Sequence, residues 1–525
     1  MNFNELTEEH IEQAKTIYTN KSLSWDDRMK SLMDFFGKSE RTVRKWCSEK
    51  LGFKEKPDVE SEQYEQAKKR KTNKKTKRFI ITWAQNNTPV HSGFFTNIEA
   101  YAKEINADIH VIAGRYKNPT SLSDERTEDF WVDEVSPYLD ANRHNIHLYL
   151  SIMSDVKIQP TATNPMSGLQ GMSGVNSCIF GSPKVQMEMI PVLEGNKPKM
   201  MITTGAVTQI NYTDSKSGKK GEFHHTLGFA IVEIKDNETF FVRQVTANDR
   251  TGAFTDLCFK VDKGQVKKID DIAAIVLGDI HYGHHDEEVL SKTLELMNKL
   301  KPEHVILHDV FDGNSISHHE MKDPFMQYAK EIEGTNSVEQ EINAMLNGLE
   351  SFKKFKNVVI VRSNHDDFLD RWLKNEDWKK QPTSKNSLVY MEYSAILLKQ
   401  YASDRYKVKG VVPELINKKF PKFVTLGRND SYKVKNWELG QHGDVGSNGS
   451  RGSLLQFRKL NTKIVVGHYH SPGRKDGALA VGTSTKMRVG YNIGPSSWLQ
   501  SHVIIHQDGK AQHINFINGE FTTLI

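Results

Sequence analysis

Apolar runs that each end in polar side chains constrain the fold of this chain more than any other feature. Runs within residues 272–277, 304–307, 358–361 and 463–466 are apolar, and chelating side chains follow each of them. An amphipathic helical pattern at 287–300 separates the first two runs. This repetition predicts an α/β fold, in which sites form at the carboxyl ends of the strands. We therefore expect one site assembled from several strand ends.

The side chains that follow these runs belong to the types that bind divalent transition metals. Asp-x-His and His-x-His spacing suits chelation, because alternate side chains of a strand point the same way. Seven ligands suit two ions that share one carboxylate, and ions about 4 Å apart clamp the oxygens in phosphoester hydrolysis. The candidate ligands are Asp279, His281, Asp309, Asn364, His442, His468 and His470.

In this order the motifs resemble those of the calcineurin-like metallophosphoesterases, over roughly residues 270–505. The series is Asp-x-His, an Asp after a strand, Asn-His-Asp, a single His and Gly-His-x-His. The resemblance implies a C-terminal metallophosphoesterase sandwich that holds two divalent metal ions per chain. Manganese is the expected metal, with Mg²⁺, Fe²⁺ and Zn²⁺ as alternatives.

The resemblance also implies a role for each residue. Asp309 would bridge the two ions, His365 would be the catalytic histidine and Asp366 would orient it. One ion would be held by Asp279, His281 and His470, and the other by Asn364, His442 and His468. His365 is not a ligand, so its imidazole can protonate the leaving oxygen or stabilise charge on the phosphate.

Three positions depart from the family pattern. His308 and Ser363 stand where glycine is usual, directly before Asp309 and Asn364. Gly313 stands where protein Ser/Thr phosphatases carry an arginine that grips the phosphate. The segment "DVFDGN" is more similar to the SbcD-like DNA nuclease branch, although that branch often has a histidine at the position of Asp312. These departures favour a nuclease over a protein phosphatase.

The N-terminal segment resembles a helix-turn-helix unit. Thr7, Ser24 and Ser39 each precede a helical apolar pattern, as helix caps do. Basic residues near the start of the third pattern would face DNA as on a recognition helix. Lys68 to Arg78 contains eight basic residues and no acidic one, which predicts either a phosphate-contacting arm or a solvated linker. The candidate DNA contacts are Arg41, Arg44, Lys45, Lys68, Lys69, Arg70 and Lys71.

These patterns predict four segments: a helix-turn-helix-like unit at 1–53, a basic linker or arm at 54–78, a central α/β domain at 79–262 and the metallophosphoesterase domain at 263–525. The central domain has predicted strands near 78–84, 108–114, 199–207 and 228–234, and a Gly-, Ser- and Met-rich loop at 163–183. It carries no catalytic signature, and its role is open.

The favoured function is a divalent-metal-dependent DNA nuclease. The alternative is a phosphoesterase for a small molecule or a protein, with the N-terminal part as a regulatory module. A third hypothesis, a DNA-binding regulator with an inactive metal site, conflicts with the complete ligand set. The order of the parts is also similar to that of the early DNA-degradation and DNA-transfer proteins of T5-like phages, which implies destruction of host DNA.

Composition indicates the cellular compartment in which the chain is expected. No apolar run reaches the roughly 18 residues of a membrane span, and the polar N-terminus does not resemble a signal peptide. Cys47, Cys178 and Cys258 lie far apart, as is typical of a reducing compartment. We expect a cytoplasmic protein, in the host cytoplasm if it is phage-encoded. DNA and further copies of the chain are the expected partners, with no membrane partner.

Overall fold

The computed structural model describes residues 3–20, 25–53, 62–73, 75–116, 130–381, 384–490 and 492–525. The three predicted N-terminal helices are present and enclose a small core that includes Leu32, Phe36 and Trp46. Thr7 caps the first helix and accepts a hydrogen bond from the His10 amide at 3.3 Å. Ser24 lies outside the described residues. The helices are α1 (Glu8–Thr19), α2 (Trp25–Phe36) and α3 (Glu40–Lys45), which continues as a π-helical turn at Trp46–Lys50.

Part of the predicted linker is folded. Residues 62–68 form helix α4 (Glu62–Lys68), and its Tyr64 and Ala67 are buried in the core of the central unit. The Tyr64 ring stacks on Trp131 with centroids 5.9 Å apart. The linker between the helical unit and the central unit is therefore limited to 54–61, which lie outside the described residues.

The central unit contains two sheets and, between β1 and β2, the helix α5 (Ser92–Ile105). The first sheet has the order β10 (Phe240–Thr246), β9 (Gly228–Ile234), β1 (Arg78–Gln85), β2 (Asp108–Gly114) and β3 (Leu139–Asp140). The second contains β7 (Gln186–Ile190), β8 (Lys199–Thr203), β6 (Ser177–Phe180), β5 (Leu150–Met153) and β4 (Arg143–His147). Helix α6 (Lys216–His224) and a small sheet of β11 (Phe254–Asp256), β12 (Phe259–Asp262) and β13 (Gln265–Lys268) complete the unit.

The C-terminal unit also contains two sheets, with helix α7 (Glu287–Leu300) between β14 and β15. The first has the order β17 (Val424–Thr425), β16 (Val358–Ile360), β15 (Pro302–Leu307), β14 (Ile272–Val276), β23 (Ser501–Ile505) and β24 (Ala511–Asn515). The second contains β18 (Lys433–Val434), β19 (Trp437–Glu438), β20 (Lys463–Val466), β22 (Ala478–Ala480) and β21 (Gly473–Lys475). Further helices are α8 (Pro324–Glu333), α9 (Val338–Gly348), α10 (Asp366–Asn375), α11 (Ser384–Ser403), α12 (Val411–Lys419) and α13 (Leu454–Phe457).

The two units share one sheet. Strand β7 pairs antiparallel with β21, with Met187 opposite Arg474 and Gln186 opposite Lys475, so that ten strands form one continuous sheet. Without this pairing each strand would expose the unpaired backbone groups of a sheet edge. The predicted boundary at residues 262 and 263 therefore separates two segments whose strands are hydrogen-bonded to each other.

The two units also have the same topology. In the first sheet of each, three parallel strands (β1–β2–β3 and β14–β15–β16) continue into two antiparallel ones (β9–β10 and β23–β24). The C-terminal sheet adds β17, parallel to β16. In the second sheet, β4–β5–β6–β8–β7 repeats the strand directions of β18–β19–β20–β22–β21. Helices α5 and α7 each have 14 residues and a left-handed C-cap. The chain thus contains the same sandwich twice, joined at equivalent strands as in a symmetric dimer.

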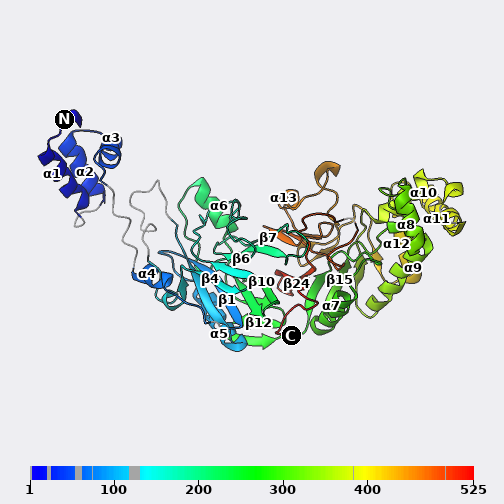
Figure 1. The fold of residues 1–525 in the computed structure, drawn as a ribbon. Helices are drawn as coiled ribbons and strands as arrows, with labels where there is room; N and C mark the ends of the chain where they lie inside the picture. Colours follow the sequence, from blue (N-terminus) through cyan, green and yellow to red (C-terminus); the bar gives the residue numbers. More distant parts are fainter. Residues whose placement is uncertain are drawn as a thin grey trace.

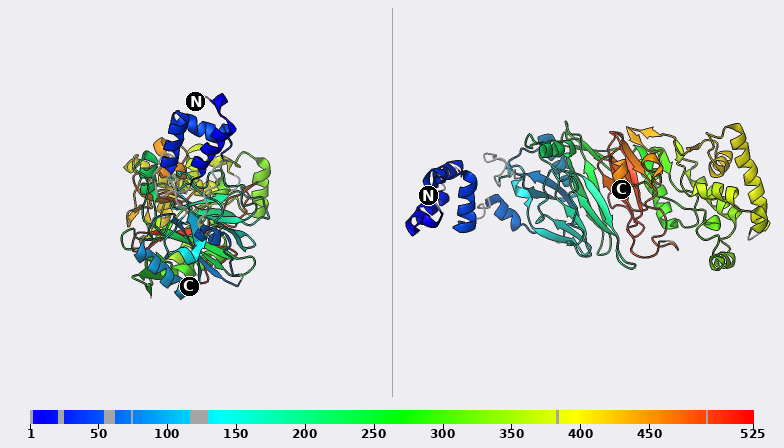
Figure 2. Two further views of the ribbon diagram at one scale, coloured as in Figure 1. Left: turned by 90° about the vertical axis from the view of Figure 1, so that its left-hand side faces the viewer. Right: turned by 90° about the horizontal axis from the view of Figure 1, so that it is seen from above.

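Figure 1 shows the helical unit at one end of an elongated molecule and helices α8 to α12 at the other. Seen from above, the central and C-terminal units lie side by side between these ends (Figure 2). Among the described residues, no helix is both long enough and apolar enough to cross a membrane.

A buried ion cluster of the central unit is also hydrogen-bonded to the C-terminal unit. The Arg243 guanidinium binds both carboxylate oxygens of Asp256, at 2.6 and 2.7 Å, and also contacts Glu233. Gln512 of β24 donates to Asp256 at 2.7 Å. Arg243→Met leaves two buried carboxylates without their cation, so we expect a loss of about 3–5 kcal/mol in unfolding free energy.

Urea unfolding followed by tryptophan fluorescence measures this loss, with the exposed Arg250→Met as the matched control. A midpoint equal to that of the control would show that the cluster does not stabilise the junction.

Candidate metal centre

The structure brings all seven predicted ligands to one place. Asp279 and Asp309 follow β14 and β15, Asn364 follows β16, and both carboxylates are buried. His281 lies beyond β14 of the first sheet, whereas the other three histidines come from the second sheet: His442 lies beyond β19, and His468 and His470 follow β20. The site therefore lies where the carboxyl ends of strands from both sheets meet, as the sequence predicts.

Four side chains form one tight group. His281 Nε2 lies 3.0 Å from His470 Nε2 and 3.5 Å from Asp309 Oδ2. His470 Nε2 lies 3.2 Å from Asp279 Oδ2. The potential ligand atoms of these four residues all lie within 4.8 Å of one another. This is the predicted first set together with the bridging carboxylate.

The predicted second set also contacts Asp309. His442 Nε2 is 3.0 Å from Asp309 Oδ2, and His468 Nδ1 is 3.1 Å from Asn364 Oδ1. The rings of His442 and His468 meet edge to face, with centroids 5.3 Å apart. Asp309 is thus adjacent to both sets, the position that a bridging carboxylate requires.

The backbone at the ligands is strained. His281, Asp309, His468 and His470 have φ angles of 48°, 44°, 74° and 56°, in the left-handed region that residues other than glycine rarely adopt. Such conformations cost on the order of 1–3 kcal/mol each and concentrate at functional sites. They arise because each buried strand must turn sharply at its end to direct the side chain into the centre.

The donor set fits divalent metal ions. Both Asp279 carboxylate oxygens and Asp309 Oδ1 are buried and make no hydrogen bond to any described residue. A buried carboxylate without a partner is costly, and oxygen atoms of this kind are cation ligands. Two imidazole nitrogens also face each other at 3.0 Å, an arrangement that suits two ligands of one ion.

Protons take the place of cations in the metal-free site. Burial lowers the pKa of His281 and of His442, but the neighbouring carboxylates, led by Asp309, together outweigh this effect and raise each pKa to about 9. Burial would raise the pKa of Asp309, but His442, His365 and His281 hold it well below its usual range. The free site therefore contains imidazolium groups beside ionised carboxylates, and ion binding must displace those protons.

His308 and Asp312, which depart from the family pattern, each contact a ligand histidine. His308 is completely buried, with Nδ1 3.3 Å from His442 Nδ1, so it contacts a ligand from behind. A side chain at Gly467 would collide with Asp279 and His308, which explains the glycine before His468. Asp312 Oδ1 lies 2.9 Å from His281 Nδ1 and orients that ligand, as carboxylates behind metal-binding histidines do.

The environment of His365 corrects the predicted role of Asp366. His365 Nδ1 contacts the backbone carbonyl of Asp312, and its ring packs on Phe368 with centroids 4.7 Å apart. The Asp366 carboxylate instead accepts a hydrogen bond from the Ser363 amide at 3.0 Å. Asp366 therefore stabilises the turn that carries Asn364 and His365, and the Asp312 carbonyl orients the histidine. Ser363 is needed in this turn, because its hydroxyl accepts from the Asp366 amide at 3.2 Å.

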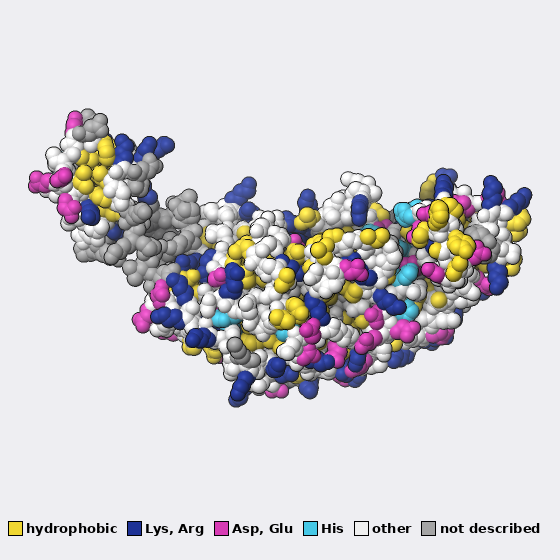
Figure 3. Space-filling model, viewed as in Figure 1, with side chains coloured by type: hydrophobic (Ala, Val, Ile, Leu, Met, Phe, Trp, Pro, Cys, Tyr) yellow, Lys and Arg dark blue, Asp and Glu magenta, His cyan; other side chains and the backbone are white. Residues whose placement is uncertain are grey.

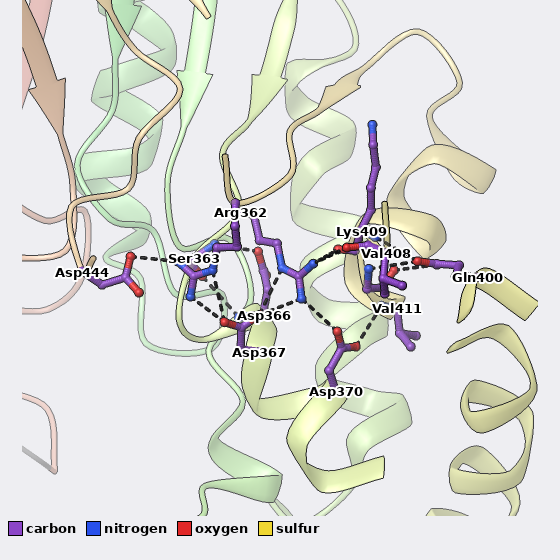
Figure 4. A network of polar contacts seen from close by, with 12 residues as sticks. Arg362, Ser363, Asp366, Asp367, Asp370, Gln400, Val408, Lys409, Val411 and Asp444 are labelled. Carbon is purple, nitrogen blue, oxygen red and sulfur yellow. Dashed lines mark hydrogen bonds and ion pairs between the residues drawn. The ribbon is translucent and has the colours of Figure 1, made fainter. Parts of the chain in front are cut away.

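An ion network holds this turn in place (Figure 4). Arg362 binds Asp367 at 2.7 Å and Asp370 at 2.9 Å, and it also donates to the carbonyls of Val408 and Lys409. Arg428 binds the other Asp367 oxygen at 2.6 Å and Asp444 at 2.8 Å. Since Asp444 is two residues from His442, the network ties the Asn364 turn to the loop of a second ligand.

The centre opens into a cavity of about 600 Å³. Its walls include Asp309 and His365, the aromatic rings of Phe368 and Trp498, and Arg451. Sequence reasoning found no arginine to grip a phosphate, because Gly313 occupies the usual position. The structure supplies Arg451 from the loop that follows His442, a placement that no local sequence signal indicates.

The predicted DNA contacts fall into two groups. Arg41 and Lys45 are exposed on α3, while Arg44 forms an ion pair with Glu40 at 2.8 Å. Figure 3 shows basic side chains on the α3 side of the helical unit and acidic ones on the opposite side.

The basic run is partly occupied by contacts within the protein. Lys68 pairs with Glu65 at 3.1 Å, and Arg70 donates to the carbonyls of Pro137 and Ile109 at 2.8 and 2.7 Å. Lys69 and Lys71 are exposed. Arg70 thus fastens the segment to the central unit.

Metal binding should depend on pH in a defined window. The pKa of His281 and His442 in the folded chain is about 9, above the ordinary 6.5, so their stabilising effect is full below pH 6.5 and lost towards pH 9. The Tm of chelator-treated protein should fall over this range, and the gain in Tm on adding Mn²⁺ should grow. At pH 7.5, Mn²⁺ should release about two protons per chain in weakly buffered solution. Release unchanged by Asp309→Asn would contradict this assignment.

Comparison with known proteins agrees with the geometry. Residues 273–481 match the model of the calcineurin-like phosphoesterase family. Protein A1 of Escherichia phage T5 is 31% identical over 464 residues, which cover 85% of this chain and 83% of that protein. Together with the assembled ligand set, these similarities show that the chain belongs to the calcineurin-like phosphoesterases, metal-dependent hydrolases that act on phosphoesters.

Proposed function

We propose that this phosphoesterase is a nuclease that hydrolyses the phosphodiester bonds of DNA. The observation that carries the proposal is the cavity at the metal centre, in which the non-ligand His365, Arg451 and two aromatic rings surround the bridging Asp309. A volume of about 600 Å³ suits a nucleotide unit, and aromatic faces stack on bases of any sequence. The exposed basic residues of α3 would bind the DNA backbone outside the cavity.

The residues of the cavity have separate roles in the proposed reaction. Divalent ions, when held by the two ligand sets, supply an activated water and neutralise phosphate charge. His365 Nδ1 contacts the Asp312 carbonyl and so carries a proton there, and in the imidazolium form Nε2 carries a second proton that it can donate to the leaving oxygen. Phe368 restricts the ring, and Arg451 offers a guanidinium to the phosphate oxygens.

The similarity to protein A1 of phage T5 supports a phage origin for this chain. In that setting, the substrate would be host DNA and the site of action the host cytoplasm. Manganese is the proposed metal, because mixed imidazole, carboxylate and amide ligands suit it. A homo-oligomer is the proposed assembly.

A phosphoesterase for a small molecule or a protein is the second candidate. It is favoured by the internal contacts of Arg44, Lys68 and Arg70, which reduce the positive charge available for DNA. The preferred substrate distinguishes the nuclease from this second candidate function. Purified protein with Mn²⁺ should digest plasmid, linear or single-stranded DNA far faster than a generic phosphomonoester, with Asp309→Asn as the inactive control. A preference for the phosphomonoester would refute the nuclease.

His365→Ala tests the proton donor. The variant should keep its metal content and fold but lose about two to four powers of ten in DNA hydrolysis. The loss should be smaller for a nitrophenyl phosphodiester, whose leaving group needs little protonation. Equal losses on both substrates would assign His365 to positioning, and activity near wild type would show that it has no part in catalysis.

Deletion of residues 1–53 tests the helical unit and leaves α4 on the central unit. Hydrolysis of the nitrophenyl diester should be unchanged, while DNA binding weakens. If the unit makes roughly two to three phosphate contacts, the slope of log affinity against log salt should flatten by about two to three units. Arg41→Gln with Lys45→Gln should reproduce most of this change in the full chain. Unchanged affinity and slope would assign the unit to another partner.

A further inference from the structure

A second cavity, of about 280 Å³, lies at the junction of the two sandwich units. Lys184 and His224 line it from the central unit, and Lys463, Arg474, Asp476 and Lys510 line it from the C-terminal unit. Lys463 is the first residue of β20, whereas the ligands His468 and His470 follow its last residue. The cavity is therefore at the opposite end of this strand from the metal centre.

Positive charge is in excess in this junction cavity. Asp476 is the single carboxylate among the lining residues, and it is already bound by Lys184 Nζ at 2.8 Å and His224 Nδ1 at 3.3 Å. Lys463 and Lys510 form no ion pair with any residue that the structure describes. Burial, and then the charge of Lys463, lowers the pKa of Lys510. Asp508 and Asp249 act in the opposite direction but more weakly, so the pKa of Lys510 stays below its ordinary value.

The lack of a balancing negative charge is clearest at Arg474. Its side chain is 9% exposed, and Nε is fully buried without a hydrogen-bond partner among the described residues. Burial lowers the pKa of this guanidinium to about 10. A buried cation without hydrogen bonds to a carboxylate costs several kcal/mol, so an arginine in this position indicates an anionic ligand that supplies the acceptors.

The duplicated topology relates one residue of the junction cavity to a ligand of the metal centre. Strands β6 and β20 pair with β8 and β22 in the same manner, and Phe180 and Val466 end them at equivalent positions. Counting onward, Gly181 corresponds to Gly467, Ser182 to His468 and Lys184 to His470. The strand end that provides metal ligands in one unit thus provides a cation in the other.

We propose that the junction cavity binds the phosphate group of a single nucleotide. A planar guanidinium with two lysines is suited to phosphate oxygens, and the small volume admits a mononucleotide rather than duplex DNA. The exposed Phe223 at its edge offers a ring face to a base. The site is separate from the metal centre and does not depend on the proposed nuclease activity.

Calorimetric titration of the full chain tests this site. The protein is treated with chelator, so that no metal ion at the metal centre can bind the phosphate. The probes are inorganic phosphate, a deoxynucleoside 5′-monophosphate, the matching deoxynucleoside, and a short oligonucleotide with a 5′-phosphate or a 5′-hydroxyl. The monophosphate should bind more tightly than inorganic phosphate, and the deoxynucleoside should not bind. If the 5′-phosphorylated oligonucleotide binds more tightly than the monophosphate, the ligand is the end of a DNA strand. That result would overturn the single-nucleotide assignment.

Arg474→Met and Lys510→Gln should each weaken monophosphate binding by about ten- to a hundredfold, and the exposed Lys267→Gln is the matched control. Without phosphate, Arg474→Met should unfold at the same temperature as wild type or higher, since it removes an unpaired buried cation. A structural arginine would give the opposite result, a lower unfolding temperature. Binding of the monophosphate that survives both substitutions, or its absence in the wild type, would overturn the proposal.

Discussion

The burial of two neighbouring carboxylates, Asp279 and Asp309, is the constraint on which the C-terminal unit depends. An ionised carboxylate removed from water requires a compensating charge, and each of these is completely buried. Imidazolium groups provide that charge in the absence of metal, and divalent ions are suited to replace it. Four of the ligands have left-handed backbone conformations, which persist only where the surrounding structure holds them.

The central unit shows the same framework without this constraint. Its strands β1 and β2 end at Gln85 and Gly114, and Ser182 and Lys184 follow β6, so no pair of carboxylates directly follows these strands among the residues that the structure describes. The unit nevertheless keeps its strand order, because that order is fixed by apolar burial and backbone pairing rather than by the site. Freed from metal ligands, the equivalent strand end contributes to a cavity of opposite charge.

Sequence reasoning located the metal centre because the signal was local: an apolar run followed by chelating residues at fixed spacing. The two-sheet sandwich and the bridging role of Asp309 instead follow from the resemblance to the calcineurin-like metallophosphoesterases. The duplication left no such signal, since the two units share hydrogen-bond topology but not the residues that mark the site. The resemblance assigns Asp366 to His365, yet the helical turn directs its carboxylate to the Ser363 amide. Arg451 reaches the cavity from a loop, which spacing along the chain cannot reveal.

The unit without ligands still acts on the metal centre. Val192, between β7 and β8, exchanges two backbone hydrogen bonds of 2.9 Å with Ser496. Two residues on, the Trp498 ring packs edge to face on His470 with centroids 4.2 Å apart, and Leu499 donates to the His470 carbonyl at 3.1 Å. A segment of the central unit therefore fixes the loop that fixes a ligand. Because β7 is also the strand that pairs with β21, the pairing that joins the two sandwiches is continuous with the wall of the catalytic cavity.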